Sequence, residues 1–363
     1  MLRVATIQAE RGMRLALPVH RPMSDDVLLR EGFVLDGPTI GRLREIRIPE
    51  VWIDYPGAER IRSLISPQVL RLQARLASQV SDLFDRVQRQ AGAKLNYNTY
   101  RDSVGSMLDG LLVDRNAALH LSEIAGAGGS LPRHATAVCL LSLLLGLRLE
   151  GYLVHERAQL HVQHARNTTS LGVGAMLHDV GLTRLPEHAA THEHDLDADD
   201  EAWRSHTRLG FDLVSSGVDA SAAIVVLDHH QRWDGVGFPE HDHFGGAARP
   251  QRGREIHVFA RIAAVADAYD RLLHRPGEES WPRVRVLRTL LSPPLCTRFD
   301  PVVLTTLPVV APPYPPGSMV TLNDGRRAFI LNWDIEAPCR PIVVPAEPGS
   351  TKRSVKETPI DLR

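Results

Sequence analysis

Cysteine, unbalanced charge and long hydrophobic runs are scarce in this sequence. The three cysteines, Cys139, Cys296 and Cys339, are far apart and odd in number, which argues against a disulfide framework and favours a reducing compartment. The net charge is −1, so neither a large basic surface for nucleic acid nor an acidic tail is expected. The most apolar run, at 137–147, is too short to span a bilayer, and the N-terminus has no apolar signal core. We therefore expect a cytoplasmic protein with no membrane span that binds no nucleic acid.

The chain is long enough for two or three domains and is predicted to be mainly α. Its 363 residues, 43% hydrophobic and 23% charged, are typical of a globular protein. Strand-like runs flank a short helical segment near the N-terminus, and a hairpin signal around Gly325 follows a proline-rich linker at 308–317. The expected segments are a small α+β N-terminal module at 1–60, a helical connector at 61–128, a helical domain at 129–305, and a proline-rich linker with a small β module at 306–363.

Histidine is abundant, with 17 residues, so chance pairs must be discounted. Two of the three His-Asp pairs, at 194–195 and 241–242, lie in polar segments and are expected to be solvated. The third, His178-Asp179, ends the apolar segment SLGVGAMLHD, where a desolvated carboxylate needs a compensating positive charge. Taken alone, this pair is explained most simply by a hydrogen bond at a helix end, and a metal ion is the alternative.

Five further polar residues stand at the edges or on the faces of apolar helical segments in the same block. Each has a simple structural explanation, but their joint occurrence on successive predicted helices favours a common site. Imidazole and carboxylate together suit iron, manganese or zinc. Seven ligands exceed one tetrahedral site and fit two ions that share a bridging carboxylate. The candidate ligands are His134, His178, Asp179, His206, His229, His230 and Asp267.

The order of these residues resembles the HD-GYP family, a bacterial branch of the HD-domain metal phosphohydrolases. The family's His-Asp-x-Gly-Lys motif is matched by HDVGL at 178–182, and its HHExxDGxGYP motif by HHQRWDGVGFP at 229–239. Its helix motif ARIxxVADxxDAL is matched by ARIAAVADAYDRL at 260–272, and a downstream FDP element by residues 299–301. The resemblance covers about 130–305 and implies an HD-type helical bundle there.

The resemblance implies a metal-dependent phosphodiesterase that hydrolyses cyclic di-GMP, or a related cyclic dinucleotide, in bacterial second-messenger signalling. It implies two divalent ions, iron or manganese, with His178 and Asp179 catalytic and Asp179 bridging both ions; the identity of the metal is left open. The glycines of the second motif are expected to let the backbone approach the nucleotide. A homodimer or a signalling-protein partner is also left open. The residues expected to bind substrate are Arg232, Gly235, Gly237, Phe238, Pro239 and Arg275.

Three positions depart from the first two of these motifs. Leu182 replaces the motif lysine, Gln231 the glutamate and Phe238 the tyrosine, so a cationic phosphate contact is missing. This loss favours an alternative function, a catalytically weak or inactive module that binds a cyclic dinucleotide or a partner protein as a sensor. Retention of all seven candidate ligands favours the enzyme, because a module that only binds has no need of them.

Overall fold

The structure is a computed structural model, and the chain divides into two compact units. It describes residues 1–90, 96–113, 131–186, 200–243, 246–275, 280–334, 336–346 and 358–359. The first unit comprises Met1–Ser78, Gly110–Gly128 and Ala311–Arg363, and the second comprises Gln79–Asp109 and Gly129–Val310. The four-segment division made from the sequence stays a prediction about domains, and the break at 125–130 lies outside the described residues.

The N-terminal part of the first unit is the small α+β arrangement expected from the sequence. Strand β1 (Leu2–Ala5) pairs antiparallel with β4 (Glu50–Ile53), and β2 (Val19–His20) pairs with β3 (Val27–Leu29). Helix α1 begins after Asp36, whose carboxylate accepts a hydrogen bond from the Thr39 amide as an N-cap. The remaining elements near this end are η1 (Thr6–Gln8), α1 (Gly37–Glu45), α2 (Glu59–Arg62) and α3 (Pro67–Arg89).

The C-terminal strands form an antiparallel sheet in the order β5-β6-β7-β8. The predicted hairpin is confirmed, with Gly325 at a φ of +84° in its turn. One face of this sheet contributes Phe329, Leu331 and Val344 to the core that contains Leu2 of β1. The two terminal parts of the chain therefore share one core. The strands are β5 (Met319–Thr321), β6 (Arg327–Asn332), β7 (Ile342–Pro345) and β8 (Thr358–Pro359).

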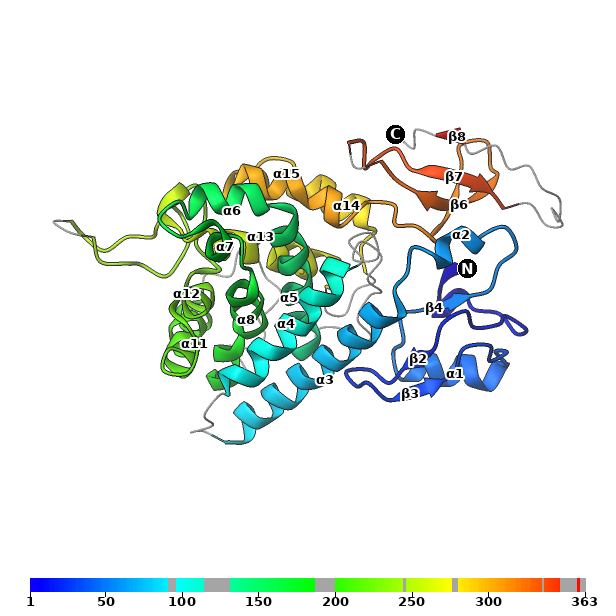
Figure 1. Ribbon diagram of the computed structural model, residues 1–363, viewed down its shortest axis with the longest axis horizontal. Helices are drawn as coiled ribbons and strands as arrows, with labels where there is room; N and C mark the ends of the chain where they lie inside the picture. Colours follow the sequence, from blue (N-terminus) through cyan, green and yellow to red (C-terminus); the bar gives the residue numbers. More distant parts are fainter. Residues whose placement is uncertain are drawn as a thin grey trace. The chain divides into compact units, whose positions relative to one another are not determined.

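The second unit is helical, which confirms the predicted fold class. Helix α5 packs against α8 and α13, and α12 packs against α8 and α11 (Figure 1). The elements are α4 (Tyr97–Val113), α5 (Leu131–Arg148), α6 (Glu150–Glu156), α7 (Val162–Ala165), α8 (Thr169–Leu177), η3 (Val180–Arg184), α10 (Glu201–Arg204), α11 (His206–Val214), α12 (Ala220–Asp228), η4 (Gly253–Glu255), α13 (Val258–Leu273), α14 (Arg283–Leu290), η5 (Leu295–Arg298) and α15 (Pro301–Val310).

Two of the family-like motifs have a structural role in this unit. Buried Arg261, from the ARI sequence of α13, donates to Asp300 of the FDP element at 2.6 Å and to the Tyr152 hydroxyl at 2.8 Å. It also pairs with Glu156 of α6. The Arg261 charge is compensated by these two carboxylates, and its contacts link α13 to α6 and to the start of α15.

Helix α15 extends further than the sequence suggests. It includes Pro308 and ends at Val310, so the first three residues of the predicted linker are helical. Among the described residues, no single helix has both the length and the apolar composition to cross a membrane; α5 and α6 meet those criteria only as a pair bent by 83°.

Candidate metal centre

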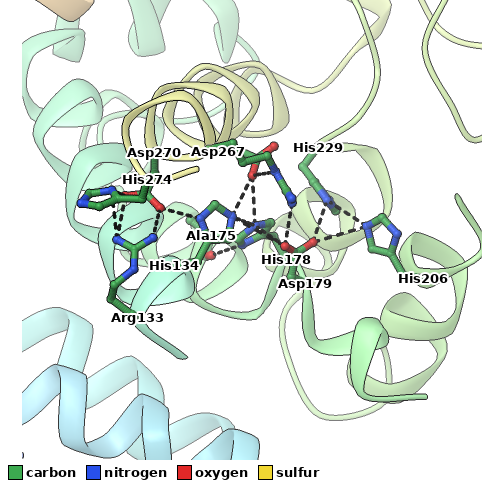
Figure 2. Close-up of polar contacts among 11 residues, drawn as sticks. Arg133, His134, Ala175, His178, Asp179, His206, His229, Asp267, Asp270 and His274 are labelled. Carbon is green, nitrogen blue, oxygen red and sulfur yellow. Dashed lines mark hydrogen bonds and ion pairs between the residues drawn. The ribbon is translucent and has the colours of Figure 1, made fainter. Parts of the chain in front are cut away.

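The seven predicted ligands come together in the helical unit, from five separate elements of the chain. Figure 2 labels all of them except His230. They form two overlapping groups, and within each group the ligand atoms lie within 4.8 Å of one another. Site A consists of Asp179, His206, His229 and His230, and site B of His134, His178, Asp179 and Asp267. Asp179 belongs to both sites, so its carboxylate is placed to bridge two ions.

Three histidines are oriented by backbone carbonyls that precede them in the chain. In each, Nδ1 lies within hydrogen-bond distance of the carbonyl oxygen three residues earlier. The pairs are His178 with Ala175 at 2.7 Å, His206 with Trp203 at 2.6 Å, and His229 with Val226 at 3.0 Å. Because a carbonyl oxygen only accepts, Nδ1 must carry a proton and donate it. In its neutral form, each of these rings presents an Nε2 lone pair to the centre.

His134 is oriented by a carboxylate that the sequence reasoning missed. Its Nδ1 lies 2.7 Å from Asp270 Oδ2. Asp270 in turn accepts two hydrogen bonds from the guanidinium of Arg133, at 2.6 and 3.0 Å (Figure 2). The signal was present in the sequence, since Asp270 follows Asp267 by three residues and shares its helix face. Asp270 and Arg133 therefore position His134 rather than bind metal.

The donor atoms of both sites fit divalent ions. The Nε2 atoms of His206 and His229 are 3.3 Å apart in site A, and those of His134 and His178 are 3.3 Å apart in site B. Two nitrogens about 2.1 Å from one ion, at an angle of about 90–110°, lie about 3.0–3.4 Å apart. The histidine spacing thus matches shared coordination.

Two buried atoms of site A also lack a hydrogen-bond partner among the described residues. They are Oδ1 of Asp179 and Nε2 of His230. Buried polar atoms normally have a hydrogen-bond partner. Because these two atoms belong to the same group of candidate ligands, their lack of one favours an ion at site A.

Site B contains a cation from the protein itself. Buried Arg271 donates from Nε to Asp267 Oδ1 at 2.6 Å and from Nη2 to Asp179 Oδ2 at 2.7 Å. The sequence reasoning did not assign Arg271 a role. Its signal was a charged residue one helical turn after Asp267 in a helix that is mostly apolar.

The charges of the centre shift the pKa values of its members in opposite directions. Burial would raise the pKa of the Asp179 carboxyl, but the positive charges of His178 and Arg271 hold it well below its usual range. Burial would lower the pKa of His178, yet the carboxylates of Asp179 and Asp267 raise it to about 10. Burial lowers the pKa of His229 to about 4. An ion held by Nε2 of His178 would displace the extra proton of that ring.

An aromatic and aliphatic wall lies beside site A. The ring of Phe238 stacks on His230 with centroids 4.7 Å apart, and Trp203 lies 5.0 Å from the same imidazole. Leu182, in place of the motif lysine, is buried in a cluster with Trp203 and Phe238. The departure at Leu182 therefore replaces a cation by apolar packing.

A cavity of about 150 Å³ adjoins the ligands. Three of the predicted substrate residues, Arg232, Gly237 and Phe238, line it, together with His229, His230 and Asp267. Arg204 and Arg298 also line it and were not predicted.

The other predicted substrate residues have different surroundings. Gly235, Pro239 and Arg275 are not among the residues that line this cavity in the described part of the chain. The carbonyl of Pro239 accepts a hydrogen bond from Gln231, and Arg275 stacks over the ring of Trp281.

The two predicted glycines are required by the turn itself. Gly235 has a φ of +83°, which favours glycine. A Cβ on Gly237 would lie 2.4 Å from the amide nitrogen of Arg232 and 2.5 Å from the carbonyl oxygen of His230. The need for glycine here thus arises from close backbone approach within the protein, before any nucleotide is considered.

Together, the helical fold and the shared aspartate define a histidine–aspartate domain built to hold divalent metal. Residues 146–283 match the family model described as HD domain, a range that contains six of the seven ligands. A cyclic di-GMP phosphodiesterase of Pseudomonas aeruginosa is 26% identical over 364 residues, covering 92% of this chain and 82% of that protein. These matches show an HD domain in the chain, and its motifs at 178–182 and 229–239 resemble those of the HD-GYP family.

Two shorter matches are also to proteins named as cyclic di-GMP phosphodiesterases. A cyclic di-GMP phosphodiesterase response regulator of Xanthomonas campestris is 34% identical over 114 residues, which cover 30% of this chain and 28% of that protein. A cyclic di-GMP phosphodiesterase of Thermotoga maritima is 31% identical over 143 residues, covering 36% of each. These two matches span about a third of each relative.

Proposed function

We propose that the protein is a metal-dependent phosphodiesterase that hydrolyses cyclic di-GMP or a related cyclic dinucleotide in bacterial signalling. The observation that carries the proposal is the shared carboxylate of Asp179. Its Oδ1 faces His206 and His229 at 3.4 and 3.5 Å, and its Oδ2 lies 3.3 Å from Nε2 of His178. A carboxylate between two groups of imidazoles is the arrangement that two-ion phosphodiester hydrolysis needs. The names of the relatives support the choice of substrate.

Two ions, iron or manganese, held by sites A and B would stabilise the charge that develops on the phosphate oxygens. The chain's own residues bind and orient the nucleotide. Phe238 lines the cavity and offers an aromatic ring for contact with a base. Arg204, Arg232 and Arg298 line the cavity and bring positive charge to the phosphodiester; Arg232 also pairs with Asp234.

The remaining assignments are part of the same proposal. His178 and Asp179 are the catalytic residues, and Gly235, Pro239 and Arg275 stay predicted substrate residues. A cytoplasmic location, and a homodimer or signalling-protein partner, also stay predictions.

The proposal is tested with purified protein, loaded anaerobically with Fe²⁺ or Mn²⁺ and supplied with several cyclic dinucleotides. Products are separated chromatographically, and bound metal is measured by elemental analysis. We expect hydrolysis by the wild type and none by Asp179→Ala, which should also lose metal because its bridging ligand is gone. Asp212→Ala, an exposed aspartate on α11, is the matched control and should behave like the wild type.

Two results would contradict the proposal. Turnover by Asp179→Ala at a near-normal rate with full metal content would exclude the two-ion centre. Tight binding of a cyclic dinucleotide without any product, in metal-loaded wild type, would instead identify a binding module.

A further inference from the structure

Arg271 departs from the family motif inside the metal centre. The helix motif ARIxxVADxxDAL has alanine at its second-to-last position, and this chain has arginine there. The side chain is only 1% exposed although it is charged. Burial of a cation requires compensation, and the compensating groups are the carboxylates of Asp179 and Asp267.

The oxygens that Arg271 engages are those of site B. Asp267 Oδ1 receives the Arg271 Nε hydrogen bond and lies 2.9 Å from Nε2 of His134. Asp179 Oδ2 receives the Nη2 hydrogen bond and lies 3.3 Å from Nε2 of His178. An ion at site B would need these same oxygens, and it would meet a positive charge already hydrogen-bonded to both.

Site A has no such competitor among the described residues. The carboxylate oxygen that it uses is Asp179 Oδ1, whereas Arg271 contacts Oδ2. The buried Nε2 of His230 accepts no hydrogen bond from a described residue and faces the same site. The two sites thus differ in their contacts with Arg271, whose hydrogen bonds go to the carboxylate oxygens of site B.

We propose that Arg271 is an internal cation that competes with the second metal ion. The centre then takes one ion tightly at site A, and takes a second at site B only when Arg271 releases its two carboxylates. This inference rests on the metal binding in the proposed function. Arg271 is a positioning residue here, because it acts on ligands and not on substrate.

Titration of the metal-stripped full-length protein with Mn²⁺ tests the inference. Calorimetry gives the two dissociation constants, and the electron paramagnetic resonance signal of spin-coupled Mn²⁺ pairs reports filling of both sites. In the wild type we expect the second ion to bind at least tenfold more weakly than the first. Arg271→Ala should tighten the second ion at least tenfold, about 1.4 kcal/mol, and leave the first within twofold.

Further variants separate charge from structure. Arg271→Lys keeps the charge but lacks the fork that reaches both carboxylates, so its second dissociation constant should fall between those of wild type and alanine. Arg271→Met, with a similar apolar stem, replaces the alanine variant if that one does not fold. Arg288→Ala, an exposed arginine on α14, is the matched control and should titrate like the wild type.

Thermal unfolding gives a second readout. Without metal, Arg271→Ala should unfold below the wild type, because two buried carboxylates lose their partner. Saturating Mn²⁺ should close that gap, since the second ion then compensates both carboxylates.

The outcomes distinguish the inference from the proposed function. Equal affinity for both ions in the wild type, an unchanged second constant in Arg271→Ala, or a stability gap that persists in Mn²⁺ would overturn the role of Arg271 and leave the two-ion centre intact. Failure of both wild type and variant to bind either Mn²⁺ or Fe²⁺ would overturn the proposed function itself.

Discussion

The substitution Gly181→Ala would place a methyl group where the backbone of α11 lies. A Cβ atom built on Gly181 falls 1.9 Å from the carbonyl oxygen of His206 and 2.6 Å from the amide nitrogen of Gly210. Both neighbours are backbone atoms, so no side-chain rotation relieves the overlap. Real Cβ atoms essentially never approach within 3.0 Å, so η3 and α11 must separate by about 1.1 Å.

This separation moves a metal ligand, because His206 is the first residue of α11. Ligand distances in metal sites are held within about 0.2 Å, so a shift of about 1 Å is several times the tolerance. We expect Gly181→Ala to weaken binding of the first Mn²⁺ ion at least about tenfold, as supporting residues of metal sites do when altered. Overpacking should also lower the free energy of unfolding by about 3 kcal/mol or more.

Two other glycines provide a graded comparison. A Cβ on Gly210 would meet a methyl group of Val226 at 2.9 Å, and a side chain adjusts more easily than backbone. A Cβ on Gly105 of α4 meets no heavy atom within 4 Å. Calorimetric Mn²⁺ titration and chemical denaturation should therefore show the largest losses of Mn²⁺ affinity and stability in Gly181→Ala. The losses should be smaller in Gly210→Ala and smallest in Gly105→Ala. A Gly181→Ala protein with the metal affinity and stability of Gly105→Ala would refute the reasoning.

Two further predictions concern single side chains. Leu182→Lys, which restores the motif residue, should lower the melting temperature measured by calorimetry, because its ammonium would be buried against Trp203. Leu182→Met should keep the wild-type melting temperature. A lysine variant as stable as the wild type would contradict this prediction. Burial lowers the pKa of His257 to about 4. The free energy of unfolding therefore has its full contribution from neutral His257 above about pH 6.5, and this contribution is lost as the pH falls toward 4. His257→Asn, which can still cap α13, should unfold with a weaker pH dependence over that range than wild type; equal slopes would exclude the effect.

Much of the candidate site could be named from the sequence. Its ligands stand at the ends or on single faces of strongly apolar helices, where a polar residue is unexpected, and the long motif at 229–239 adds their order. The structure brings all seven named residues together. The helical class of the central block and the C-terminal hairpin were also predictable, because apolar periodicity and the Asn-Asp-Gly turn are local signals.

Other features depend on contacts between distant residues. The C-terminal sheet shares its core with the N-terminal strands because Phe329, Leu331 and Val344 form an apolar face that a sheet this small cannot bury alone. Local patterns showed that face to be apolar but could not tell which part of the chain covers it.

The surroundings of the ligands were likewise decided by tertiary structure. Arg133 and Asp270 are 137 residues apart, and Arg271 and Asp179 are 92 residues apart, yet each pair is joined by a buried, charge-assisted hydrogen bond. A sequence shows that a residue is charged but not which partner compensates it once water is excluded. That choice depends on how α5, α8 and α13 pack, because buried charges are stable only where the packing brings opposite charges within a few ångströms.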